Sequence, residues 1–214
     1  MKYSALIVAA GSGSRMGLGY NKLLYTFDSG ETIIEKTVSI FLKDAQCTQI
    51  VLVISEEDRE VFKKLFPQED IVFTIGGDTR QESVYNGLKE VKEDHVMIHD
   101  GARPWLSQEC LKRILDELSV HKACLLMVPV KDTIKEVVNG KVVQTFVRSN
   151  LRQAQTPQAF ETKLIIESYE KAMRQGVVAS DDAQVVELCS DEIVYEVEGS
   201  YENLKVTTIE DIRS

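Results

Sequence analysis

The chain has 214 residues, of which 43% are hydrophobic and 28% are charged. This length fits one domain that buries a core without disulfides or metal, and the composition disfavours disordered and coiled-coil proteins. The formal net charge of −9 argues against a nucleic-acid-binding protein, because a polyanion requires a basic surface. If the chain binds a phosphate compound, its cations must therefore be gathered at one place.

Cysteine usage and hydropathy predict the setting of the protein. The four cysteines are isolated and form no C-x-x-C pair, so we expect neither a zinc site nor disulfides, and a cytoplasmic location. The apolar run near Met1 is short and leads directly into glycines, which predicts a first strand rather than a signal peptide. No segment has the roughly 20 apolar residues that a membrane helix needs, so we expect no membrane contact.

Up to Val130 the chain alternates strand patterns with helical ones, which predicts a layered α/β fold with a largely parallel sheet. Apolar runs predict the strands, and apolar residues three to four positions apart predict the helices. The expected strands cover residues 6–8, 50–54, 71–75, 95–98 and 124–130, and the expected helices cover residues 33–42, 56–66, 81–91 and 107–120.

Residues 133–148 break this alternation. Two short strand patterns flank Asn139-Gly140, the dipeptide best suited to a two-residue type I′ hairpin turn. An isolated hairpin is marginal in water, so this one must lie on its own sheet or on another subunit. We expect it to be a dimerisation arm.

The remaining chain returns to helix over residues 160–176. Ser180 is expected to cap a shorter helix, with Asp181 and Asp182 playing a structural role near its positive end. A strand over residues 193–197 is followed by a loop that reaches Thr208 and leads into a last short strand.

The glycine-rich turn after the first strand predicts an anion site. Gly11 and Gly13 allow backbone N–H groups to turn toward a phosphate, while Arg15 and Lys22 supply positive charge. The turn fails the Walker A pattern, and Met16 stands where a dinucleotide fingerprint needs its third glycine. The alternative is an ordinary strand-to-helix turn with solvated cations.

Polar residues also follow other predicted strands, where ligands bind in parallel sheets. Asp100 could face a metal or a substrate hydroxyl, or form an Asx turn, and Arg103 could clamp a phosphate or pair on the surface. We assign no catalytic role to His99, and Ser12 and Ser83 lack the partners of a nucleophilic serine. The charges favour phosphoryl transfer.

Seven sequence blocks together closely resemble the 2-C-methyl-D-erythritol 4-phosphate cytidylyltransferase family. They span nearly the whole chain, and their order is far more specific than one glycine loop, which alone would indicate only sugar-phosphate nucleotidyltransferases. The blocks are A-A-G-S-G-S-R-M-G with N-K, G-G-D-T-R-Q-E-S-V-Y-N-G-L, H-D-G-A-R-P, P-V-K-D-T-I-K, Q-T-P-Q-A-F, S-D-D-A and N-L-K-V-T-T.

The resemblance implies a Rossmann-like α/β homodimer: a single domain over residues 1–214 with a mostly parallel sheet, helices on both faces and a hairpin arm at about residues 131–153. It implies that 2-C-methyl-D-erythritol 4-phosphate attacks CTP directly and in line, releasing pyrophosphate, in the non-mevalonate route to isoprenoids. Mg²⁺ would be held mainly by the phosphates of CTP rather than by protein ligands.

By matching positions, the resemblance also implies the roles of individual residues. Cytidine binding falls to Ala9, Ala10, Gly11, Gly77, Asp78 and Ser83, and the triphosphate to Arg15 and Lys22. The acceptor phosphate compound would contact Asp100, Arg103 and Lys205 of one subunit and Thr133, Arg148 and Thr156 of the partner's arm. Arg15, Lys22, Arg148 and Lys205 would form the catalytic set.

Two alternatives stay open at this stage. Ribitol 5-phosphate cytidylyltransferase has similar arm and phosphate blocks, although A-A-G at the first turn and the R-Q-E-S-V-Y-N-G-L and D-G-A-R-P blocks favour methylerythritol. The other alternative is a non-catalytic nucleotide-binding protein, against which the intact set of cations argues.

Overall fold

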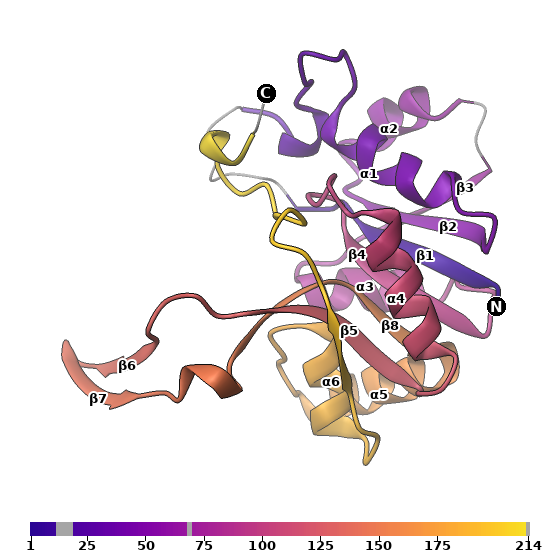
Figure 1. Cartoon of the computed structure of the whole chain (residues 1–214). Coiled ribbons are helices and arrows are strands. Elements are labelled where there is room, and N and C mark those ends of the chain that lie inside the picture. The colour runs from indigo at the N-terminus through magenta and orange to yellow at the C-terminus, as the bar shows by residue number, and fades with distance from the viewer. Residues whose placement is uncertain (12–18, 68–69, 213–214) are drawn as a thin grey trace.

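The computed structural model describes residues 1–11, 19–67 and 70–212, and its centre is a seven-stranded sheet (Figure 1). The strand order is β3-β2-β1-β4-β8-β5-β9. Neighbouring strands are parallel, except that β8 runs antiparallel to both β4 and β5. The strands of this sheet are β1 (Tyr3–Val8), β2 (Cys47–Ile54), β3 (Ile71–Ile75), β4 (His95–Asp100), β5 (Ala123–Pro129), β8 (Arg152–Glu161) and β9 (Tyr195–Glu198).

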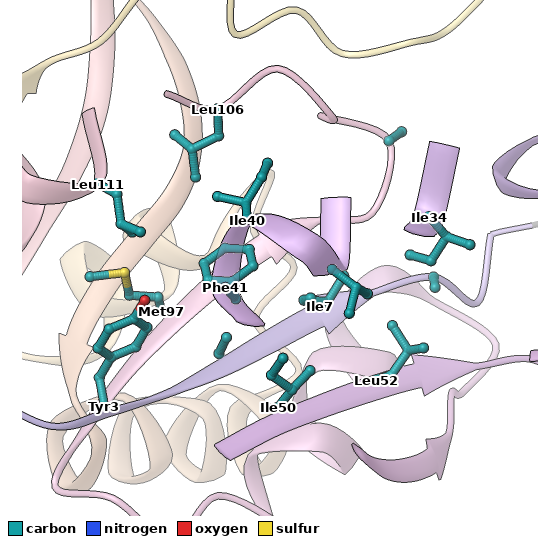
Figure 2. Packing of buried hydrophobic residues seen from close by; sticks show 14 of the residues in the cluster. Tyr3, Ile7, Ile34, Ile40, Phe41, Ile50, Leu52, Met97, Leu106 and Leu111 are labelled. Carbon is teal, nitrogen blue, oxygen red and sulfur yellow. The ribbon is translucent and has the colours of Figure 1, made fainter. Parts of the chain in front are cut away.

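Helices pack on both faces of the sheet, because successive side chains of each buried strand point to opposite faces. Ile7 and Leu52 belong to the core cluster that α1, α2 and α4 cover, part of which Figure 2 shows. Leu6 and Val53 belong to the second cluster, under α3, α5 and α6. The helices are α1 (Ile33–Leu42), α2 (Arg59–Leu65), α3 (Arg80–Leu88), α4 (Gln108–Leu118), α5 (Thr162–Gln175) and α6 (Asp182–Cys189).

The predicted α/β class and largely parallel sheet are confirmed, and most elements lie where the sequence places them. The helix α1 has the predicted bounds. The helices α2, α3 and α4 are shorter than predicted, because hydrogen-bonded turns replace some of their outer residues. Asp58 N–H donates to Ser55 Oγ ahead of α2, and α3 ends in turns in which Glu90 N–H and Val91 N–H donate to carbonyls three residues back.

The sequence prediction was wrong for β8, which was not anticipated, and α5 begins at Thr162 rather than at residue 160. Glutamines break the apolar pattern of this strand, yet Gln155 and Gln158 are buried. Gln158 donates from Nε2 to Asp181 Oδ2 over 2.9 Å and accepts from Ala183 N–H over 2.7 Å. Polar side chains therefore occupy a central strand because the next segments of chain satisfy them.

Two further expectations near the C-terminal end are corrected. Asp181, not Ser180, caps α6, because the Asp181 side chain accepts from Gln184 N–H. No strand follows Thr208 within the described residues; a 3-10 helix, η4 (Ile209–Asp211), stands there instead.

The predicted hairpin is present as a separate two-stranded sheet, β6 (Lys135–Val138) and β7 (Lys141–Thr145). At its turn Asn139 has φ 50° and Gly140 has φ 75°, the positive values that a type I′ turn requires. Figure 1 shows that the hairpin projects away from the main sheet, and every residue from 131 to 150 is exposed.

Gly87 allows α3 to lie directly on the sheet. A Cβ at this position would be 2.7 Å from Val53 Cγ2 and 2.9 Å from Leu6 Cδ1, closer than carbon atoms pack. The helix that follows the second glycine-rich loop is thereby fixed at a short distance from β1 and β2.

We expect Gly87→Val to lower the free energy of unfolding by about 2 kcal/mol or more, because the added carbons overpack the contact with β1 and β2. Urea denaturation measures the change. Glu170→Val, at an exposed position of α5, is the matched control and should change stability by less than about 0.5 kcal/mol. Equal stability of the two variants would contradict the close contact.

Candidate functional site

A cavity of about 540 Å³ opens at the carboxyl ends of β1, β3 and β4, the edge at which parallel sheets bind ligands. We call it the larger cavity. Each of these strands contributes the loop that follows it, and the segment that ends in Val206 closes one side. Its lining residues are Val8, Ala10, Gly11, Lys22, Leu23, Gly77, Asp78, Thr79, Arg80, Ser83, Asp100, Gly101, Ala102 and Lys205.

The first loop is fixed by backbone hydrogen bonds and by one side chain. Ala9 N–H donates to Val53 O over 2.7 Å, and the Asn21 side chain donates to Ala9 O and, over 2.8 Å, to Asp58 Oδ2. Asn21 also caps the 3-10 helix η2 (Lys22–Leu24), so it places Lys22 at the cavity. Arg15, like Gly13 of the expected anion cradle, lies outside the described residues.

The second loop is built from glycines that admit no side chain. A Cβ on Gly76 would lie 2.6 Å from Ala10 Cβ, and one on Gly77 would lie 2.4 Å from Glu82 Cβ. Ser83 Oγ accepts from Gly77 N–H over 3.1 Å and donates to the Thr79 carbonyl. The side chains of Thr79 and Glu82 form a capping box, which fixes the start of α3 directly after the glycines.

Asp100, at the end of β4, lies among three cations. Lys205 Nζ is 2.8 Å from Asp100 Oδ2 and Arg103 Nε is 3.5 Å from the same oxygen. Arg80 Nη2 is 3.5 Å from Asp100 Oδ1. Burial alone would raise the pKa of this carboxyl, but the surrounding positive charges outweigh burial and hold its pKa well below the usual range.

The segment from Asn203 to Val206 is tied to the site through its backbone. Lys22 Nζ donates to Val206 O over 2.6 Å, and Arg103 Nη1 donates to Asn203 O over 2.7 Å. Val206 N–H in turn donates to Ala102 O. These bonds bring Lys205 beside Asp100 although the two residues are far apart in the sequence.

Buried hydrogen bonds connect His99 to Arg103 and, through Thr156, to Asp100. His99 Nε2 must donate to Arg103 O, since a carbonyl only accepts. Nδ1 is therefore the acceptor of a hydrogen bond that the Thr156 hydroxyl donates. Thr156 Oγ1 also accepts from Asp100 N–H over 3.0 Å. Burial dominates the titration of the imidazole and lowers the pKa of His99 to about 4.

A smaller cavity, of about 260 Å³, adjoins the larger one. The two share Arg80, Asp100 and Lys205, which stand between them. The other lining residues of the smaller cavity are Arg103, Ala154, Gln155, Thr156, Gln158, Ser180 and Asp181.

The structure gathers most of the residues that the sequence singles out. Those at or beside the two cavities are Ala9, Ala10, Gly11, Lys22, Gly77, Asp78, Ser83, Asp100, Arg103, Thr156 and Lys205. Thr133 and Arg148 lie instead on the exposed hairpin segment, where Arg148 Nη1 donates to Lys131 O. Thr156 corrects one expectation: it is buried in β8 beside Asp100 of its own chain and does not belong to the arm.

Sequence reasoning missed Arg80, which lines both cavities. The signal that could have found it is the Thr79-x-x-Glu82 capping box, because this box places Arg80 in the first turn of a helix that opens at the site. Its partner Asp182 was predicted to have a structural role near the start of α6, but no partner for it was predicted.

No group of three or more His, Cys, Asp or Glu side chains suited to a metal ion occurs in the described ranges. Over the same ranges, no helix is long and apolar enough to cross a membrane.

A cavity at the carboxyl edge of the sheet, lined by the loops after β1 and β3 and bordered by cations, is typical of nucleotide-binding α/β proteins that act on phosphates. Comparison with known proteins agrees. A sequence model of the 2-C-methyl-D-erythritol 4-phosphate cytidylyltransferase family matches residues 3–214. The chain therefore belongs to this family.

Individual relatives are similar over nearly their full length. The protein of that name from Bacillus cytotoxicus is 42% identical over 98% of this chain and 94% of its own. The crystal structure of 4-diphosphocytidyl-2C-methyl-D-erythritol synthase from Anaerococcus prevotii superposes with a TM-score of 0.88 at 34% identity, covering 98% of this chain and 92% of that one. The crystal structure of 2-C-methyl-D-erythritol 4-phosphate cytidylyltransferase from Thermus thermophilus superposes with a TM-score of 0.82 at 31% identity, covering 99% of this chain and 95% of that one. These matches favour the methylerythritol branch over the ribitol one.

We expect acid to destabilise the protein partly through His99. The unfolded chain protonates this imidazole near pH 6.5 and the folded chain only near pH 4, so its contribution is complete above pH 6.5 and is lost as the pH falls toward 4. The loss amounts to about 3 kcal/mol. Urea denaturation of the wild type and His99→Gln between pH 7 and about 4 isolates this term, since both proteins share every other group.

Glutamine keeps one donor and one acceptor, so the variant should show the shallower pH dependence. Identical slopes for the two proteins would mean that His99 does not titrate as its buried hydrogen bonds require.

Proposed function

We propose that this chain transfers the cytidylyl group of CTP to 2-C-methyl-D-erythritol 4-phosphate and releases pyrophosphate. Its relatives are named 2-C-methyl-D-erythritol 4-phosphate cytidylyltransferases. The observation that carries the proposal is the family match over residues 3–214, combined with the position of the matching residues around one cavity. The chain is thus a cytidylyltransferase of isoprenoid biosynthesis by the non-mevalonate route.

The larger cavity suits the nucleotide. We assign cytidine binding to the loops after β1 and β3, whose residues Gly11 and Gly77 line the larger cavity. Lys22 stands at the same wall and, with Arg15, is assigned to the triphosphate. The cytidine-binding residues of this proposal are Ala9, Ala10, Gly11, Gly77, Asp78 and Ser83.

The acceptor is assigned to the boundary between the two cavities. Asp100 offers carboxylate oxygens to hydroxyl groups, while Lys205 and Arg103 offer positive charge to a phosphate. Thr156 belongs to the same chain as Asp100, and its hydroxyl oxygen accepts a hydrogen bond from Asp100 N–H, which helps to hold Asp100 in place. Thr133 and Arg148 complete the acceptor site only if a second chain supplies its hairpin.

The reaction needs positioning and charge stabilisation more than acid–base chemistry. An oxygen of the acceptor phosphate, already ionised near neutral pH, forms a bond to the α-phosphorus while the bond to the bridging oxygen breaks and pyrophosphate leaves. Lys22 and Arg15 stabilise the developing negative charge. Lys205 and Arg148 hold the attacking phosphate in line.

Mg²⁺ fits this site as an ion that arrives with the nucleotide. Asp78 and Asp100 are the carboxylates that line the larger cavity, and Asp100 is already paired with cations. Mg²⁺ commonly uses one or two carboxylates together with substrate phosphates and water, so a complete protein cage is not required. When bound, it would neutralise phosphate charge.

We also propose that residues 1–214 form one nucleotidyltransferase domain that dimerises through its arm, at about residues 131–153. Support comes from the apolar side chains that the hairpin segment exposes, since an isolated two-stranded sheet needs a surface to cover it. They are Ile134, Val137, Val138, Val142, Val143, Phe146 and Val147.

We expect wild-type protein with CTP and Mg²⁺ to release pyrophosphate on addition of 2-C-methyl-D-erythritol 4-phosphate, faster than with ribitol 5-phosphate. Lys22→Ala should lower kcat by about 100-fold, because a preorganised cation that stabilises the departing pyrophosphate is lost. The variant also leaves Val206 O without its donor, at a cost of about 1–3 kcal/mol in stability, so folding is checked by circular dichroism.

Lys112→Ala, which removes an exposed lysine of α4, is the control and should retain wild-type kcat. CTP binding without acceptor-dependent pyrophosphate release in the wild type would contradict the proposed activity. A preference for ribitol 5-phosphate would contradict the proposed acceptor.

We expect Val142→Asp to yield monomers in sedimentation velocity experiments, because a carboxylate would be buried in the interface that the hairpin forms. Loss of the dimer should also lower the rate of pyrophosphate release with 2-C-methyl-D-erythritol 4-phosphate, since Arg148 of the partner no longer reaches the site. Val178→Asp places the same charge at another exposed valine and should leave the dimer intact. A dimeric Val142→Asp protein would exclude the arm as the interface.

A further inference from the structure

Arg80 occupies a position that the proposed reaction does not yet use. It is the first residue of α3 and stands between the two cavities, beside Asp100. Its side chain is 32% exposed, so the guanidinium is accessible from the cavities while its inner edge is enclosed.

The enclosed edge is held by a buried carboxylate. Arg80 Nη1 donates to Asp182 Oδ1 over 3.0 Å and Nη2 donates to Asp182 Oδ2 over 2.8 Å, a two-pronged pair. Tyr169 Oη donates to Asp182 Oδ1 over 2.5 Å. Asp182 is fully buried, so α5 and α6 together fix both the carboxylate and the arginine that it binds.

The outer side of the same guanidinium faces Asp100. Arg80 Nη2 is 3.5 Å from Asp100 Oδ1, too long for a strong hydrogen bond but close enough for charge attraction. The other oxygen, Oδ2, is paired with Lys205 over 2.8 Å. The two oxygens of Asp100 are thus used differently, and Oδ1 keeps capacity to accept a hydrogen bond.

We propose that Arg80, held in place by Asp182 and Tyr169, is a positioning residue. It orients Asp100 Oδ1 toward the acceptor but does not form a two-pronged ion pair with Asp100. Asp182 binds the Nη1/Nη2 edge of the guanidinium, and this holds Arg80 so that Nη2 remains 3.5 Å from Asp100 Oδ1 and no two-pronged pair with Asp100 forms. This role rests on the proposed function, in which Asp100 accepts hydrogen bonds from the hydroxyl groups of the acceptor.

The contact with Asp182 also keeps Arg80 positively charged. Burial works against the charged form, but the contact with Asp182 outweighs burial and raises the pKa of Arg80 above its ordinary value. An arginine released from Asp182 would find Asp100 as its nearest carboxylate and would pair with it fully. The acceptor would then compete with an internal ion pair for Oδ1.

The test compares Tyr169→Phe, Asp182→Asn and Arg80→Lys with the wild type. We expect each to raise KM for 2-C-methyl-D-erythritol 4-phosphate, by about tenfold for Asp182→Asn and less for Tyr169→Phe, with a much smaller change in KM for CTP. Arg59→Lys is the matched control, because Arg59 also begins a helix and pairs with a carboxylate, Glu56, but lines neither cavity.

A purely structural ion pair would lower stability without raising KM for the acceptor selectively, and that outcome would overturn the proposal. If Asp182→Asn does not fold, Tyr169→Phe, which removes one hydroxyl, decides in the same way. Wild-type protein that does not turn over the acceptor would contradict the proposed function instead.

Crystal structures of the wild type and Asp182→Asn decide the point without an activity measurement. We expect the Arg80–Asp100 contact to shorten from 3.5 Å into a two-pronged pair in the variant. An unchanged contact would show that Asp182 does not restrain Arg80.

Discussion

The arrangement of the site depends on one buried carboxylate, Asp100, and on the three cations that compensate it. An ionised group that leaves water is tolerated only when it is paired, so Arg80, Arg103 and Lys205 must all be near it. They come from the start of α3, the loop after β4 and the segment before Val206. Asp100 is therefore paired with a neighbour in its own loop, Arg103, and with two cations from separate segments, Arg80 and Lys205, at one edge of the sheet.

This requirement explains how an acidic protein can bind two phosphate compounds. The chain carries a net charge of −9, yet Lys22, Arg80, Arg103 and Lys205 border two adjoining cavities. Local charge rather than total charge governs the field inside a cavity, since exposed charges farther than about 8 Å are screened at physiological salt. In the loop after β3, Gly76 and Gly77 let the backbone pack against Ala10 and Glu82 where a side chain would collide.

The sequence predicts the α/β alternation and the hairpin turn because these depend on local patterns, whereas most residues of the candidate site are predicted only through the family resemblance. Asn139-Gly140 is an example, since its positive φ values follow from the dipeptide itself. It does not predict β8 or Arg80. The polar residues of β8 are buried only because later segments satisfy them. The capping box places Arg80 at the start of α3, but its partner Asp182, about a hundred positions away, is not predicted by any local pattern. Such long-range pairings leave little trace in local periodicity.

The backbone ties of Val206 imply an order of assembly during synthesis. β1, β2, β3 and β4 can pair once residue 100 has left the ribosome, but Lys22 finds its carbonyl partner and Asp100 its lysine only when residues 205 and 206 have emerged. A nascent chain would thus be able to form the strand pairs among β1, β2, β3 and β4 before Lys205 and Val206 reach the cavities. Lys205 and Val206 are therefore the last residues at the two cavities to be synthesised.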